Sequence, residues 1–200
     1  MDSARWHLGL SYPDRAIPLP VHETEDIEAW AESTAWSWLP ADASDTAVDE
    51  FARALLDATE DSRTRSPLHA YFLAPFPEHG ELARIEVHIV SPGDSELTLE
   101  QLTEYFGAPD ATSLDPPRRS YRYLPSGPAA RIAHQYLGAD DETEGALITQ
   151  TLVYAIKPTE LPQGIVLVMT WDALYYRDEL LDVGDSIAES IRITQEAATA

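Results

Sequence analysis

The chain of 200 residues carries 35 acidic side chains against 13 lysines and arginines, which gives a formal net charge of -22. Such a charge repels phosphate backbones and anionic lipid at long range, so nucleic acids and membrane surfaces are excluded as expected partners. The sequence contains no cysteine, which excludes disulfides, thiolate zinc sites and cysteine nucleophiles. A hydrophobic share of 44% is enough for a folded core.

The sequence shows no targeting segment. Residues Met1 to Leu10 lack the continuous apolar run of a secretory signal, and the longest apolar stretch, Ile165–Met169, is too short to span a bilayer. We therefore predict a cytoplasmic protein. Lys157 is the only lysine beside 12 arginines, and the chain is rich in Ala, Asp and Pro, a usage typical of GC-rich bacterial genomes such as those of actinobacteria.

The N-terminal part predicts one strand and two helices. Apolar residues alternate over Trp6–Leu10, which favours a strand, and the prolines that follow, up to Pro20, are expected to end regular structure. The acidic segment Glu23–Trp38 is compatible with a helix. Ala43–Glu60 is the clearest helix here, because its apolar residues form one stripe and Ser44 or Asp45 can cap it. Ser62–Pro67 is predicted to be a loop.

Two strands are predicted next, over Leu68–Ala74 and Leu82–Val90. In the second, apolar and polar residues alternate, which is typical of an antiparallel strand with one buried face. The residues expected to point inward are Ile85, Val87 and Ile89. The residues expected to point to solvent are Arg84, Glu86 and His88. Thr98 is placed to cap a short helix that Gly107 ends.

The C-terminal half predicts four more strands and a closing helix. Ser120–Leu124 and Ala129–Leu137 flank the turn segment Pro125-Ser-Gly-Pro128, which suits a hairpin. An acidic loop over 138–145 comes next. The remaining elements are strands over Ala146–Lys157 and Gly164–Trp171, a helix over Asp178–Ile193, and a frayed tail over Thr194–Ala200.

These elements predict an α+β fold with a mainly antiparallel sheet and flanking helices, because hairpin-type connections dominate. We predict a single domain over residues 1–200. Within it, residues 1–67 supply an N-terminal strand and helices, and residues 68–193 supply the sheet, the short helix and the closing helix.

The antiparallel run Ser120–Trp171 and the closing helix, which ends Asp185-Ser-Ile-Ala-Glu-Ser-Ile-Arg192, carry a family resemblance. Together with the strands before them, from Leu68 to Ile193, they resemble the PsbP-like fold of the extrinsic photosystem protein PsbP and the Ran-binding Mog proteins. In that family the closing helix packs back on the sheet. The resemblance implies a binding or assembly factor rather than an enzyme. Residues 1–67 lie outside it.

A basic stretch stands out in the acidic chain, since four of the 13 basic residues fall between Arg118 and Arg131. Arginine binds carboxylates in a bidentate manner, and tyrosine is favoured in interfaces. We predict a partner-binding site on a sheet face or hairpin edge, formed by Arg118, Arg119, Tyr121, Arg122 and Tyr123. The alternative is that these arginines only offset the excess acid of the protein itself.

Other clusters give weaker signals. Trp30, Trp36 and Trp38 indicate either core packing or an exposed anchor for a partner. No two histidines have the i, i+2 or i+4 spacing of a zinc site, although His69 and His88 would form a pair if they met across adjacent strands. The acidic loop lacks the ligand pattern of a calcium-binding EF-hand. We therefore predict no metal site.

The sequence has no Gly-x-Ser-x-Gly nucleophile motif, no Walker loop and no dinucleotide-binding glycine pattern. We accordingly predict no catalytic residue and no cofactor, and a non-enzymatic protein-interaction, assembly or chaperone-type module. The partner would be another protein with an acidic patch facing the arginines, or with a cationic patch facing the acidic surface. The alternative is a small-molecule-binding or hydrolytic protein with a pocket between sheet and helix, which converging titratable groups would support.

Overall fold

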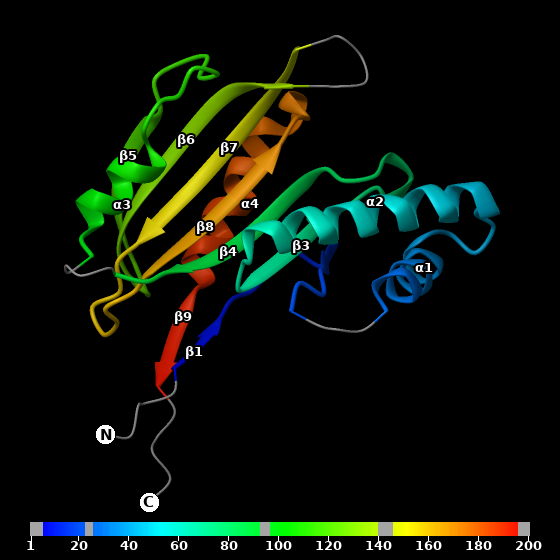
Figure 1. The fold of residues 1–200 in the computed structure, drawn as a ribbon, viewed down its shortest axis with the longest axis horizontal. Helices are drawn as coiled ribbons and strands as arrows, with labels where there is room; N and C mark the ends of the chain where they lie inside the picture. Colours follow the sequence, from blue (N-terminus) through cyan, green and yellow to red (C-terminus); the bar gives the residue numbers. More distant parts are fainter. Residues whose placement is uncertain (1–5, 23–25, 93–96, 140–145, 196–200) are drawn as a thin grey trace, which may run out of the picture.

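The computed structural model describes residues 6–22, 26–92, 97–139 and 146–195. It confirms the predicted α+β class, since most of the chain forms one antiparallel sheet with helices on both faces (Figure 1). In spatial order the sheet strands are β2 (Ala16–Pro18), β3 (His69–Leu73), β4 (Ala83–Val90), β8 (Gly164–Trp171), β7 (Ala146–Ile156), β6 (Gly127–Ala139) and β5 (Arg118–Leu124). The sheet therefore ends in β2 on one side and in β5 on the other.

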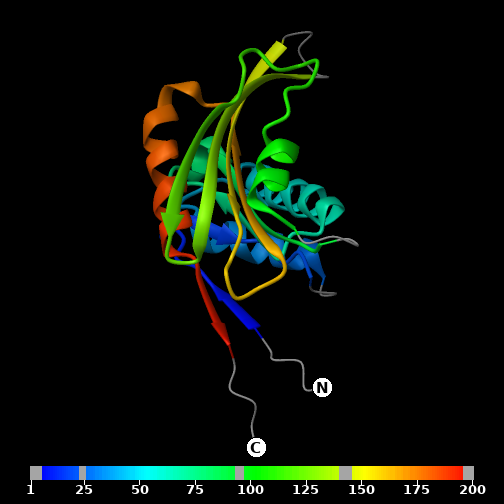
Figure 2. The same ribbon diagram turned by 90° about the vertical axis from the view of Figure 1, so that its left-hand side faces the viewer.

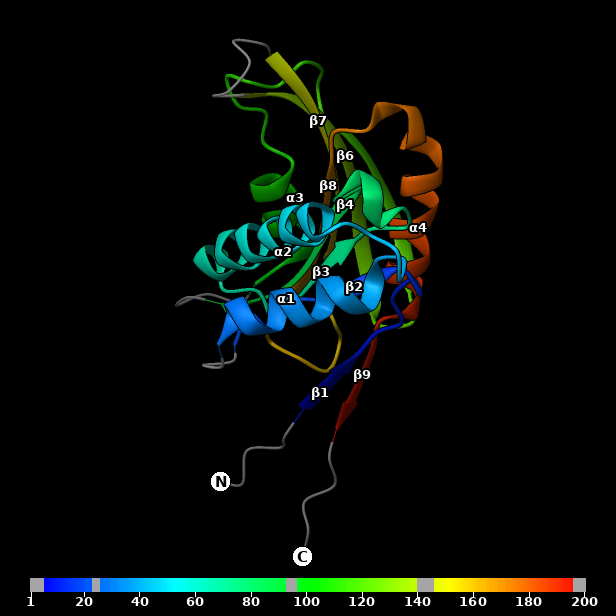
Figure 3. The same cartoon turned by 90° about the vertical axis from the view of Figure 1, so that its right-hand side faces the viewer.

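The two faces of the sheet are covered by different helices (Figure 2). The closing helix α4 (Arg177–Ser190) lies on one face, where Leu180 and Ile187 join the largest apolar core. The opposite face carries α1 (Ile27–Trp38), α2 (Asp45–Arg65) and α3 (Leu99–Phe106). Figure 3 shows α1 and α2 beside each other near β2 and β3. Within the described ranges, no helix combines the length and apolarity needed to span a membrane.

The helices on the second face form two separate contacts with the sheet. Residues of α1 and α2 pack on β2 and β3, with the rings of Phe51 and Phe72 edge to face at 5.8 Å. On α3, Leu102 packs against β6, β7 and β8. Helices α2 and α3 both begin at a predicted capping residue. Ser44 accepts a hydrogen bond from the Ala47 amide, and Thr98 forms a reciprocal capping box with Gln101.

Glycine at position 184 allows α4 to approach the sheet closely. A Cβ atom there would lie 2.5 Å from Leu152 Cδ2, inside van der Waals contact. This close approach excludes solvent from the interface between α4 and the sheet, where the Leu152, Leu180 and Ile187 side chains are all buried. The sequence alone marks Gly184 only as a weak point of the helix.

The chain ends differ from the prediction. The strand predicted at Trp6–Leu10 forms as β1 (Trp6–Gly9), but it pairs outside the main sheet with β9 (Arg192–Gln195). The closing helix thus ends at Ser190 rather than at Ile193, and the predicted frayed tail begins too early, because its first two residues belong to β9. Ile193 and Leu8 pack against the core as strand residues. Figure 1 shows this ribbon projecting from the sheet.

Three further sequence predictions need correction. Pro18 does not end regular structure but lies in β2, an edge strand, where a missing amide is tolerated. The predicted loop over Ser62–Pro67 is largely helix, because α2 continues to Arg65. Strand β6 extends to Ala139, and the acidic residues predicted to form the loop after it lie at 140–145, outside the described residues.

Strand β4 departs from its expected faces in two residues. Ile85 and Val87 are buried as predicted, but Ile89, the second-last residue of β4, is 49% exposed. Glu86, predicted to face solvent, is only 4% exposed. It is buried because α2 lies above this face of the sheet.

Candidate functional site

The predicted basic site lies on β5, an edge strand of the sheet. Residues from Arg118 to Tyr123 are all exposed, and only Leu124 at the end of the strand is buried. Tyr121 and Tyr123 are 65% and 79% exposed. Because β6 pairs with one side of β5, the backbone groups on its other side have no strand partner in the sheet.

The five predicted residues do not form one patch. Alternation along β5 directs Arg122 toward α4, where its Nη1 lies 3.2 Å from Asp185 Oδ2. Arg119 points to the opposite face and donates a hydrogen bond to the Gly107 carbonyl at the end of α3. Two of the three arginines thus have structural contacts, which leaves Arg118 and the two tyrosines as the exposed part of the site.

Asp185 ties α4 to the sheet through more than one bond. Its Oδ1 accepts from Arg131 Nε at 2.7 Å and from the Tyr154 hydroxyl at 2.8 Å. Burial of the phenol and its hydrogen bond to Asp185 raise the pKa of Tyr154. The fourth arginine of the basic stretch, Arg131, therefore neutralises an internal acid, which is what the alternative interpretation of that stretch expects.

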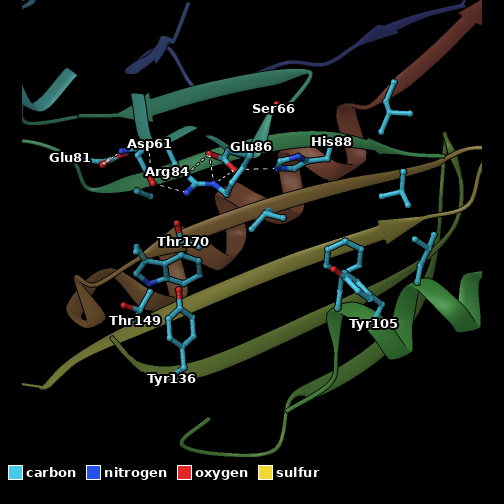
Figure 4. Close-up of a pocket in the computed structure, with 18 of the residues that line it drawn as sticks. Asp61, Ser66, Glu81, Arg84, Glu86, His88, Tyr105, Tyr136, Thr149 and Thr170 are labelled. Carbon is cyan, nitrogen blue, oxygen red and sulfur yellow. Dashed lines mark hydrogen bonds and ion pairs between the residues drawn. The ribbon is translucent and has the colours of Figure 1, made fainter. Parts of the chain in front are cut away.

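A second candidate site is a cleft of about 1230 Å³ on the other face of the sheet, between α2 and α3. Strands β4, β6, β7 and β8 supply residues of its lining (Figure 4). Figure 4 shows a row of charged side chains along one side, with the Tyr136, Thr149 and Thr170 side chains across from part of it. This is the kind of pocket that the alternative function predicts.

The charged side of the cleft is an ion-pair network centred on Glu86. Arg65 donates from Nη2 to Glu86 at 2.7 Å and from Nη2 to Asp61 at 2.6 Å. His88 Nε2 lies 3.1 Å from Glu86 Oε2. Arg84 pairs with Glu81 and donates to the Ala58 carbonyl at 2.7 Å. The i, i+4 spacing of Asp61 and Arg65 is visible in the sequence, but their link to β4 is not.

This network fixes the charge of Glu86. Burial of the carboxylate opposes ionisation, but hydrogen bonds from His88, Arg65 and Ser62 outweigh it and lower the pKa of Glu86 to about 2. The hydrogen bond from Arg65 likewise lowers the pKa of Asp61. Both groups are therefore carboxylates at neutral pH, held by arginine.

The α3 side of the cleft is apolar. Leu102 and Phe106 of α3 line it together with Val168 of β8. Tyr105 stands beside Phe106, with ring centroids 4.9 Å apart, and is 76% exposed. Since one side is ionic and the other apolar, the cleft is amphiphilic.

The histidines do not assemble a metal site among the described residues. His69 is opposite Val87 in the register of β3 and β4, so it lies on the α4 face, whereas His88 lies on the cleft face. The pair considered from the sequence therefore does not meet. Within the described ranges, no group of three or more potential ligands converges. His134 is half-buried, with Nε2 2.8 Å from the Ser113 hydroxyl.

Each of the two interpretations of the tryptophan cluster accounts for part of it. Trp30 and Trp38 pack against the core that α1 and α2 form with the sheet. Trp36 lies on the outer side of α1 and is 52% exposed. Core packing therefore accounts for two of the three rings.

Comparison with known proteins adds little. No protein-family model matches the chain, and no curated protein matches it. Among solved structures, it is similar to LpqN of Mycobacterium tuberculosis, described as involved in cell envelope biogenesis. That similarity has a TM-score of 0.48 and 14% identity, and covers 96% of this chain and 86% of LpqN. It is a weak fold relationship and leaves the PsbP-like resemblance unconfirmed.

Proposed function

We propose that this protein is a non-enzymatic interaction module that holds an extended, acidic segment of another protein along the edge of β5. The observation that carries the proposal is the strand itself, since six consecutive exposed residues border an open sheet edge. An added strand would gain main-chain hydrogen bonds there, and its side chains would meet Arg118 and the rings of Tyr121 and Tyr123.

The charge of the edge supports an acidic partner. The net charge of -22 repels an acidic segment over most of the surface, whereas β5 contributes three arginines within five residues. Arginine on an edge strand also discourages pairing between two copies of the same edge, because like charges would face one another. The same residues would thus select an acidic strand and reject self-association.

A non-catalytic role is supported by the state of the acids in the cleft. Catalytic acids and bases have pKa values near the working pH, but the pKa of Glu86 is about 2 and Arg65 donates to both of its oxygens. Asp61 and Glu81 are also paired with arginine. These groups act as a structural network rather than as proton donors or acceptors.

We propose the same family and compartment that the sequence predicts, a PsbP-like fold and the cytoplasm. The antiparallel run β5–β8 followed by the packed helix α4 supports a PsbP-like assignment. The acidic, cysteine-free composition supports the cytoplasm, which fractionation of the native host would test.

The test is a display library of extended peptides, screened against the protein and against the triple variant Arg118→Glu, Tyr121→Ala, Tyr123→Ala. We expect the wild type to enrich peptides with acidic residues at alternate positions, and the variant to lose at least tenfold in affinity. These three side chains are chosen because they are exposed. Substitution of Arg122 or Arg119 would also disturb α4 or α3.

Arg53→Glu is the matched control, since it reverses an exposed arginine on α2, outside β5. It changes the net charge by the same amount as Arg118→Glu. The proposal fails if no acidic sequence is enriched, or if Arg53→Glu weakens binding as much as the β5 variant does.

A second candidate function, small-molecule binding, is favoured by the amphiphilic cleft between α2 and α3. It needs no contact with β5, so the two functions are separable by mutation.

A further inference from the structure

The ionisable groups that line the cleft carry a net negative charge. The acids are Asp61, Glu81, Glu86 and Asp172, and the bases are Arg65, Arg84 and His88, so the sum is negative whether His88 is neutral or charged. The surrounding protein is strongly acidic as well, which raises the local concentration of cations and repels anions. The cleft therefore favours a cationic ligand over an anionic one.

Asp172 differs from the other acids of the cleft. The arginines Arg65 and Arg84 neutralise the acids beside α2, but among the described residues no base lies within ion-pair distance of Asp172. Its Oδ1 accepts one hydrogen bond, from the Thr149 hydroxyl at 2.5 Å, and the residue is exposed. An exposed carboxylate held by a threonine is available to a cation.

Two aromatic residues lie at the same end of the cleft. Tyr136 is directly opposite Thr149 in the register of β6 and β7, and Trp171 precedes Asp172 in the chain. Both line the cleft. Aromatic rings attract organic cations through their π faces, and most strongly where water is partly excluded. Tyr136 supplies such a ring, whereas Trp171 is only 3% exposed and packs in the core under α4. Its indole N–H has no acceptor among the described residues, and because Trp171 adjoins Asp172 it serves as a reporter of a ligand bound there.

The remainder of the cleft would hold an apolar body. Leu102 and Phe106 line it on the side of α3. Val168 lies directly opposite Glu86 in the register of β4 and β8, so it borders both this apolar surface and the ion-pair network. A small ion such as ammonium would leave this surface uncovered. Burial of an alkyl chain or ring against it would raise the affinity about fourfold for each methylene group covered.

We propose that the cleft binds an organic cation with an apolar body, such as an alkyl amine or a quaternary ammonium amphiphile. The cationic group lies by Asp172 and the ring of Tyr136, and the apolar body lies along Val168 and α3. This site is independent of the β5 edge, so the proposed protein-interaction function does not depend on it.

The experiment titrates decyltrimethylammonium, below the concentration at which it forms micelles, into the ¹⁵N-labelled full chain. Calorimetry gives the affinity, and a shift of the indole N–H resonance of Trp171 shows that the ligand binds in the cleft. We expect saturable binding of one molecule that shifts this resonance. Decanoate, with a similar apolar chain and the opposite charge, should bind at least tenfold more weakly. Tetramethylammonium, which lacks the chain, should also bind at least tenfold more weakly.

Two variants in the cleft and one control outside it locate the site. Asp172→Asn, at an exposed position, should lower the affinity about threefold to tenfold. Asp49→Asn removes an equal charge from the exposed side of α2, outside the cleft, and should leave the affinity within twofold of the wild type. Val168→Trp would fill the cleft and abolish binding, with the folded state checked by circular dichroism.

The proposal is overturned if decanoate binds as tightly as the cation, which would make the cleft a general apolar site. It is also overturned if Asp49→Asn weakens binding as much as Asp172→Asn, because adsorption to the acidic surface would then explain the result. Unchanged binding by a folded Val168→Trp variant would place the ligand elsewhere.

Discussion

The two faces of the central sheet are built from the same strands, yet one is sealed and the other is open. On the α4 face, Leu180 and Ile187 meet buried residues of the sheet, and Gly184 brings the helix within contact distance of Leu152. On the other face, α2 and α3 cover separate parts of the sheet and leave the cleft between them. A face covered by one closely packed helix provides stability, whereas a face shared by two helices leaves room for a ligand.

The contrast between the two faces is also seen within a single strand. In β4, Ile85 and Val87 point to the sealed face, and Arg84, Glu86 and His88 point to the cleft. Along β4, the cleft face therefore contains ionic groups, whereas the sealed face contains aliphatic side chains. Ionic groups are retained in such a place only when they are paired, and Glu86 is paired with Arg65.

The largest effect expected is on the sealed face. Ile187→Ala should lower the free energy of unfolding by about 2–5 kcal/mol, because it removes a side chain that is only 2% exposed from the core under α4. Tyr105→Ala on the cleft face should change it by less than about 0.5 kcal/mol, because that ring is 76% exposed. Urea denaturation of both variants measures the difference. Equal losses would show that α3 is as essential to the core as α4.

The second effect concerns the ion-pair network and its dependence on pH. The pKa of Glu86 is about 2 in the folded chain, against 4.5 ordinarily. Its ionised form thus stabilises the fold above about pH 4.5, and this contribution is lost as the pH falls toward 2. Each pKa unit corresponds to about 1.4 kcal/mol, so the carboxylate contributes on the order of 3 kcal/mol at neutral pH.

The measurement is the difference in unfolding free energy between wild type and Glu86→Gln across this pH range. The comparison with the variant is needed because protonation of the other acids also changes the repulsion within the chain. We expect the difference to be largest at neutral pH and to shrink below pH 4.5. A difference that is independent of pH would mean that Glu86 acts by packing and not by charge.

The smallest effect concerns the short helix of the cleft. Thr98→Ala removes the capping box of α3 and should cost about 1 kcal/mol. Because α3 has only eight residues, its amides should exchange with solvent faster as well, since short helices depend on their caps. Ser44→Ala removes the equivalent cap from the 21-residue helix α2 and should leave exchange in its interior unchanged. Equal exchange in α3 of the wild type and of Thr98→Ala would contradict this role.

Much of the fold follows from local patterns in the sequence. The stripe of α2, the capping of α3 by Thr98 and the strand Gly164–Trp171 all appear where the periodicity and end signals predict them. The errors arise where distant contacts decide the outcome. The segment around Ile193 has helical periodicity, but it forms a strand because β1 is available to pair with it.

The candidate sites show the same division. The exposure and alternation of β5 are predictable from Tyr121, Arg122 and Tyr123, but the Asp185 that pairs with Arg122 lies 63 positions later in the chain. Nothing in the local sequence marks Glu86 as buried, because its neighbours along β4 give the ordinary alternation of a half-exposed strand. Only the position of α2 over the sheet makes it an internal charge.

By itself, then, the sequence determined the class of the fold, most helices and strands, and the acidity that shapes every proposed interaction, because these depend on residue type and on spacing along the chain. The tertiary structure decided which arginines are free, which acids are paired, and where the cleft lies. Those features depend on contacts such as Arg65 with Glu86 and Thr149 with Asp172, which form only after the sheet and its helices have brought separate segments together.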